Sequence, residues 1–142
     1  MNSREFFMKS RRLLCGFTMI ELMIVVGIVA LLVALAVPSY ARFARKAHRS
    51  EAQQLLMNWA NNQEIWRSNN VTYADDLDPP LGFRAPNDDY YDFIIADVAA
   101  NSYTITATAK VGSNQEKDDQ QGISCTPITL NQSGAKTPDV CW

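Results

Sequence analysis

Hydrophobic positions are concentrated in one continuous block near the start of the chain. Residues 17–37 are almost entirely apolar and contain a single charged residue, Glu21. As a helix, these 21 residues would be roughly 31 Å long, about the hydrocarbon thickness of a bilayer. The block therefore predicts a membrane-spanning helix, with a secretory signal peptide or a lipoprotein signal as alternatives.

Two observations count against these alternatives. The apolar core of an ordinary secretory signal has about 7–15 residues, whereas this block is longer and is followed by further helical spacing. A lipoprotein signal would end in its cysteine, but Cys15 precedes the apolar block. A membrane-spanning helix remains the better interpretation.

Helical spacing resumes at Tyr40 and continues to about Asn69. Bulky residues recur every three or four positions, which is typical of an amphipathic helix with one face on a core. Pro38 lies between the two stretches and can kink a helix. A helix over 17–68 would be a membrane span joined to the helix of a soluble domain. The predicted inward face consists of Ala52, Leu55, Leu56, Trp59, Gln63 and Trp66.

The C-terminal half shows the two-residue period of β-strands. Alternation over Tyr91–Ile95 and Tyr103–Ala109 predicts two antiparallel strands. A third strand is expected over Ile123–Leu130, where the interruption by Pro127 suits an edge position. Residues 112–121 are polar and predict a turn. Together these patterns predict an α+β fold in which a long N-terminal α-helix packs on a small antiparallel β-sheet.

Charge is segregated along the chain, although the net charge is only −2. Residues 1–16 and 38–54 each carry +3, and residues 55–142 carry −7. Basic residues before an apolar segment tend to stay cytoplasmic, so we expect the N-terminus inside and the acidic part outside. Nucleic acid is not expected as a partner, because phosphate binding requires clustered Lys and Arg side chains.

The cysteine pattern suggests how a small domain could be stabilised. Few hydrophobic residues follow the apolar block, and a small core usually needs a covalent or metal cross-link. Cys125 and Cys141 lie close together in the sequence, which in an exported domain indicates a disulfide. Closing a loop of this length would contribute roughly 3 kcal/mol in the chain-entropy model.

Catalytic constellations are missing from the sequence. His48 is the only histidine, so neither a His-based triad nor a multi-histidine metal site can form, and we expect it at the surface. The loop predicted over 69–89 contains Asp75, Asp76 and Asp78, but their spacing does not match a calcium loop. We therefore expect neither enzymatic activity nor a metal or cofactor.

Arg42, Lys46 and Arg49 form a basic stripe at helical spacing. Such a stripe could contact phospholipid or nucleic acid. The favoured interpretation is a solvated face, or pairing with acidic side chains of neighbouring domains.

The boundary between the basic leader and the apolar block carries a specific family resemblance. Residues 15–26 read CGFTMIELMIVV, and this stretch closely resembles the type IV pilin family. The resemblance implies that a prepilin peptidase cuts between Gly16 and Phe17 and N-methylates Phe17. The leader, residues 1–16, would then be lost together with Cys15. The mature chain would keep an even number of cysteines.

Glu21 is the residue on which the implied assembly mechanism depends. A carboxylate in the bilayer interior is costly and usually functional. Cleavage at Gly16 would expose a positive α-amine on Phe17, and an amine buried among packed helices needs a counter-charge. In the family, the glutamate of a neighbouring subunit supplies that charge. The alternative is a glutamate near the membrane interface, or one that is protonated within the membrane.

The resemblance also implies an order of segments. The leader is followed by a membrane-spanning and polymerising half-helix, residues 17–37, and then by a periplasmic or extracellular head, residues 38–142. The subunit would reside in the inner membrane before assembly and in the pilus at the cell surface afterwards. Its partners would be other pilin subunits, the prepilin peptidase, the inner-membrane assembly platform and the membrane itself.

The C-terminal half is most similar to the PilE-type minor pilins. In the family the cysteine pair bounds a disulfide-closed region, and Cys125 and Cys141 occupy those places. A minor pilin would support pilus biogenesis, twitching motility and adhesion. The alternatives are a major pilin, a competence pilin that captures DNA, and a type II secretion pseudopilin. The resembling segments are residues 90–93, 103–108, 128–134 and 141–142.

Overall fold

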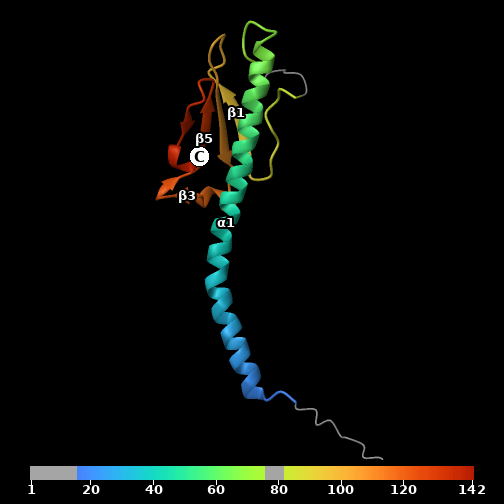
Figure 1. Ribbon diagram of the computed structural model, residues 1–142, viewed down its shortest axis with the longest axis vertical. Helices are drawn as coiled ribbons and strands as arrows, with labels where there is room; N and C mark the ends of the chain where they lie inside the picture. The colour runs from blue at the N-terminus through green and yellow to red at the C-terminus, as the bar shows by residue number, and fades with distance from the viewer. Residues whose placement is uncertain (1–15, 76–81) are drawn as a thin grey trace, which may run out of the picture. The chain divides into compact units, whose positions relative to one another are not determined.

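A computed structural model describes residues 16–75 and 82–142 (Figure 1). Residues 1–15, including Cys15, lie outside the described residues, as do Asp76 and Asp78 of the candidate calcium ligands. The chain divides into two units, and the boundary falls between Val37 and Pro38. The second unit, Pro38–Trp142, is called the head below.

One helix, α1, runs from Met19 to Arg67 and contains Pro38 in its interior. Thr18 precedes the first turn, and its Oγ1 accepts a hydrogen bond from the backbone N–H of Glu21 at 3.3 Å. This contact satisfies one of the N–H groups that a helix start leaves unpaired. The observed end at Arg67 confirms the helix that the apolar block and the later periodicity predicted.

Within the head, α1 covers the sheet with the face that its sequence spacing predicted (Figure 1). Ala52, Leu56, Trp59 and Gln63 are buried, whereas Leu55 and Trp66 are half-buried. The indole N–H of Trp59 donates to the carbonyl of Phe83, and the side-chain oxygen of Gln63 accepts a hydrogen bond from the N–H of Ala74. The core of the head therefore lies between one helix face and one sheet face.

The main sheet is antiparallel, with the strand order β1-β2-β5-β6. Its buried face is apolar, because Tyr91 and Phe93 of β1 and Ile105 and Ala107 of β2 alternate with more exposed residues. A separate two-stranded sheet pairs β3 with β4. The strands are β1 (Tyr91–Ala96), β2 (Thr104–Ala109), β3 (Asp119–Gln120), β4 (Ile123–Ser124), β5 (Ile128–Asn131) and β6 (Lys136–Thr137); the 3₁₀-helices are η1 (Asn114–Lys117) and η2 (Asp139–Cys141).

Three details of the predicted strands and turns are wrong. The third strand expected over 123–130 is split between the two sheets, and Pro127, which has no N–H for a ladder, lies in the break. The following strand β5 is internal, between β2 and β6, so an edge position was the wrong expectation. The predicted turn over 112–121 contains η1 and β3. These short elements carry little periodic signal in the sequence.

Cys125 and Cys141, which are separated by 16 positions in the sequence, form a disulfide in the structure. Both are almost fully buried in the core cluster, at 0% and 2% exposure. The bond ties the chain ahead of β5 to η2, and the carbonyl of Cys141 accepts a hydrogen bond from Gln53 of α1. The C-terminal region is thus closed on itself and attached to the helix.

Candidate functional site

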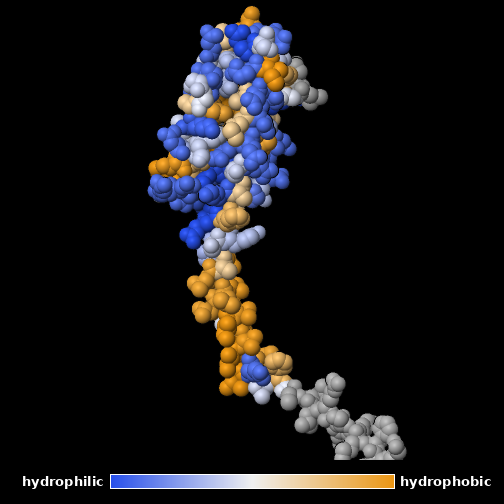
Figure 2. All heavy atoms as spheres, in the orientation of Figure 1, coloured by the Kyte–Doolittle hydropathy of each residue, from blue (hydrophilic) through white to orange (hydrophobic). Residues whose placement is uncertain are grey.

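The first unit presents an almost uninterrupted apolar surface. Its large apolar residues are exposed along the whole of residues 17–37, and the most apolar 18-residue window has a mean hydropathy of 3.0 with none of it buried. Figure 2 shows this apolar surface on the N-terminal part of α1. By length and composition, this segment could cross a membrane.

Glu21 stands at the start of this apolar segment, three residues after the capping Thr18. An acid in the first turn also interacts favourably with the positive end of the helix dipole. The Thr-x-x-Glu spacing is that of a capping box, which the sequence interpretation had overlooked. Glu21 is exposed in the single chain, as is Phe17. Its carboxylate is therefore available to a charge from another molecule.

A buried ion pair joins α1 to the residue that precedes β3. Arg49 of α1 donates to Asp118 at 3.0 Å, and each side chain is only 4% exposed. Arg49 also bonds Gln120. Burial raises the pKa of the Asp118 carboxyl above its ordinary value, and the neighbouring Arg49 opposes that rise. Arg49 thus belongs to the interior, which corrects its expected place on a solvated or intermolecular stripe.

Gln115 extends this connection between α1 and the loop before β3. Its side-chain amide donates to the backbone carbonyl of Arg45 at 2.9 Å and to the hydroxyl of Tyr91 at 2.8 Å. Burial raises the pKa of Tyr91 to about 12, an effect that the bond from Gln115 partly opposes. The loop is therefore fixed to both the helix and the sheet.

His48, which was expected at the surface, keeps part of its exposure but also packs against an aromatic ring. It is half-buried, and its ring stacks on Tyr90 with 3.6 Å between the ring centroids. Within the part of the chain that the structure describes, no group of three His, Cys, Asp or Glu side chains is placed to hold a metal ion. His48 therefore acts as a packing residue between α1 and the residue that precedes β1.

Comparisons with known proteins identify both units. Residues 11–37 match the model of the prokaryotic N-terminal methylation motif, and residues 38–129 match the model described as type IV minor pilin ComP, DNA uptake sequence receptor. The solved structure of a type IV pilin from Shewanella oneidensis aligns with a TM-score of 0.53 at 24% identity, covering 69% of this chain and 97% of that one. That alignment supports the fold.

Curated relatives agree with this assignment. The type IV major pilin PilE1 of Neisseria gonorrhoeae is 33% identical over 71% of this chain and 47% of its own length. The fimbrial protein EcpC of Eikenella corrodens is 30% identical over 67% and 62%, and the major pilin PilA of Myxococcus xanthus is 33% identical over 61% and 39%. The matches therefore span between about two fifths and three fifths of these relatives.

The chain belongs to the type IV pilin family. Members of this family are structural subunits of filaments and not enzymes. Within the family, the head matches a minor-pilin model, whereas the full-length relatives include major pilins.

Proposed function

We propose that this chain is a minor type IV pilin whose head binds duplex DNA during uptake. The observation that carries the proposal is the match of residues 38–129, most of the head, to the model of a DNA uptake sequence receptor. The expectation against nucleic acid rested on the −7 charge of residues 55–142, and a total charge does not exclude a local contact surface. Major-pilin relatives favour the second candidate, an abundant filament subunit.

The proposal includes the maturation that the N-terminal motif indicates. A prepilin peptidase cuts between Gly16 and Phe17 and methylates the new N-terminus, and the methylation-motif match over 11–37 supports this step. The inner-membrane platform then extracts the subunit, whose N-terminus lies in the cytoplasm and whose head lies outside. Glu21 provides the counter-charge for the amine of a neighbouring Phe17. As a minor subunit, the protein supports pilus biogenesis, twitching motility and adhesion.

The charges of the head constrain how it would bind DNA. Several of its cations already have intramolecular contacts: Arg67 donates to the carbonyl of Ala100, and Lys110 to that of Asp88. Lys136 lies over the ring of Trp142 at 4.6 Å. Few cations are thus left for phosphates, and each phosphate contact contributes about −0.9 to the slope of log K against log salt. We expect a shallow slope, near −2, and selectivity that comes from base or shape readout.

Binding of full-length protein in detergent to a pool of random duplexes tests the DNA part of this proposal. Selection should enrich a defined sequence, and the enriched duplex should bind at least about a hundredfold more tightly than its scrambled version. Lys117→Gln removes an exposed cation and should lower the salt slope by about one if Lys117 contacts phosphate, whereas the matched change Glu116→Gln should not. No enrichment and no measurable duplex binding would refute a DNA receptor.

Mass spectrometry of sheared surface fibres tests the minor-pilin part. The peptide should begin at N-methylated Phe17 and should be much less abundant than another pilin in the same fibres. If it were instead the predominant subunit, the chain would be a major pilin.

A further inference from the structure

We propose that α1 carries an interfacial collar, Tyr40, Arg42, Phe43 and Lys46, that binds the headgroups of anionic phospholipids while the subunit resides in the membrane. The inference rests on membrane anchoring through residues 17–37, but not on DNA binding or on copy number. It differs from the favoured interpretation of the basic stripe, which placed Arg42 and Lys46 in solvent or against neighbouring domains.

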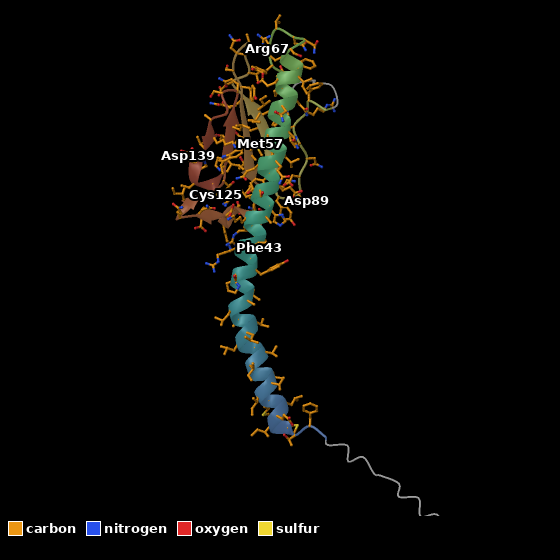
Figure 3. All side chains as sticks on the ribbon, in the orientation of Figure 1. Phe43, Met57, Arg67, Asp89, Cys125 and Asp139 are labelled. Atoms are coloured by element: carbon orange, nitrogen blue, oxygen red, sulfur yellow. A yellow bond between two sulfur atoms is a disulfide. The ribbon has the colours of Figure 1, made fainter. Side chains whose placement is uncertain are left out.

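The collar occupies the helix face that points away from the core of the head. At about 100° per residue, the four positions span an arc of about 160°. Arg49, which is buried, lies only about 20° beyond the Arg42 edge of this arc, so Arg42 borders the buried face of the helix. Tyr40 and Phe43 are 74% and 72% exposed, and Arg42 and Lys46 are also exposed. Figure 3 shows the Phe43 ring extending away from α1.

The cations of the collar have no partner within the head. Arg49 pairs with Asp118, whereas neither Arg42 nor Lys46 makes an ion pair or a hydrogen bond with the residues that the structure describes. Arg45, by contrast, donates to Asn114. Two neighbouring cations that the fold does not use are therefore free to bind an external anion.

Sequence position places the collar in the headgroup layer. Arg42 and Lys46 lie five and nine residues after Val37, the last residue of the apolar unit. These separations correspond to about 8 and 14 Å of helix, whatever the angle between the two units. Helical side chains lean toward the N-terminus, so the long Arg and Lys stems extend back toward the bilayer. Their charged groups would thus reach the phosphates, which lie within several ångströms of the hydrocarbon edge.

The two aromatic residues favour a membrane over another occupant. Tyr and Trp are enriched at membrane–water interfaces, where an amphipathic ring has one wet and one apolar side. On the arc, Phe43 lies about 60° from Lys46 and Tyr40 about 60° further on, so the two cations and the two rings form adjacent halves of one surface. The acidic head of a second copy would complement the charge, but it would leave two large rings without an apolar environment.

Lipid selectivity of the full-length protein tests the collar. The protein is placed in nanodiscs of equal phosphatidylcholine and phosphatidylglycerol, and spin-labelled versions of each lipid report their relative association by electron paramagnetic resonance. The wild type should prefer phosphatidylglycerol, and Arg42→Gln/Lys46→Gln should reduce that preference by about fivefold per charge. The charge-conserving Arg42→Lys/Lys46→Arg should retain it. Lys136→Gln, a cation on β6, should also leave it unchanged.

The remaining outcomes separate other partners from the lipid. An unchanged preference in Arg42→Gln/Lys46→Gln overturns the proposal. So does suppression of the wild-type preference by free inorganic phosphate at constant ionic strength, which would indicate a site for small anions. If the double variant keeps its lipid preference but loses filament assembly, the collar binds a second copy. If it keeps that preference but loses duplex binding, the collar binds DNA.

Discussion

The two units of this pilin use their hydrophobic residues in opposite ways. In the first unit, Phe17 and Leu35 are 81% and 71% exposed, and none of residues 16–37 is buried in the single chain. In the head, Leu56 and Ile105 are fully buried beneath a polar surface (Figure 2). The burial of apolar surface stabilises the head within one molecule, whereas the same effect in the first unit requires lipid or other subunits. A change in one unit should therefore affect assembly, and a change in the other should affect folding.

The largest expected effect is a loss of fibre assembly while the folding of the head stays normal. We expect Glu21→Val to nearly abolish incorporation into fibres, because the amine of a neighbouring Phe17 would lose its counter-charge. Leader cleavage and thermal melting of the head should remain normal. Mass spectrometry of sheared fibres and of membranes measures incorporation and processing, with Glu51→Gln, an exposed acid on the head part of α1, as the matched control. Normal assembly of Glu21→Val would remove the proposed role.

Breaking the buried ion pair should instead affect the folding of the head. Arg49→Met leaves Asp118 charged and unpaired in the interior, so the free energy of unfolding should fall by about 3–5 kcal/mol. Arg49→Met/Asp118→Leu removes both charges and should recover much of that loss. Urea denaturation of full-length protein in detergent measures both variants. The exposed control Arg42→Met should change stability little, and an equally small effect of Arg49→Met would contradict the structural role of the pair.

The disulfide provides a third comparison within the head. Cys141→Ser should lower the free energy of unfolding by roughly 3 kcal/mol, because the unfolded chain regains the freedom of the open loop. Cys125→Ser/Cys141→Ser should be only slightly less stable than either single variant, since one bond is lost in every case. Thermal melts with and without reductant measure the effect. A wild-type melting temperature that is insensitive to reductant would argue against this stabilisation.

These differences also explain what the sequence could and could not predict. The extents of α1, β1 and β2 follow from local spacing, because every residue of such an element contributes to the same period. The burial of Arg49 was not predictable in the same way, because its partner lies 69 residues further along the chain. Local periodicity marked Arg49 as part of an exposed stripe, and only the tertiary contact with Asp118 reverses that assignment.

The same distinction between local and long-range signals applies to the candidate sites. The cleavage junction and the role of Glu21 could be proposed from the sequence because the motif is contiguous and unusual for a membrane segment. The stacking of His48 on Tyr90 was missed because the two residues belong to different elements, and a lone histidine gives no sequence signal of its own. Thr18 could have been recognised from its spacing to Glu21, which is that of a capping box.

The effect that is smallest at neutral pH concerns the buried tyrosines and acts on the head alone. Burial raises the pKa values of Tyr91 and Tyr103 to about 12. In the unfolded chain, tyrosine loses its proton near pH 10. Between these values the folded head holds more protons than the unfolded chain, so stability falls as pH rises from about 10 to about 12. Each tyrosine contributes a slope of about 1.4 kcal/mol per pH unit in that window.

Tyr91→Phe separates this titration from simple packing. At pH 8 the variant should lose about 1 kcal/mol, because the amide of Gln115 loses its hydroxyl partner. Between pH 10 and 12 its stability should fall about half as steeply as that of the wild type, and Tyr91→Phe/Tyr103→Phe should remove most of the slope. Urea denaturation at closely spaced pH values gives these slopes. If the double variant were as sensitive to alkali as the wild type, tyrosine burial would not be the cause. Other titratable groups in the interior of the head would then have to explain the loss of stability, because the apolar surface of the first unit does not titrate.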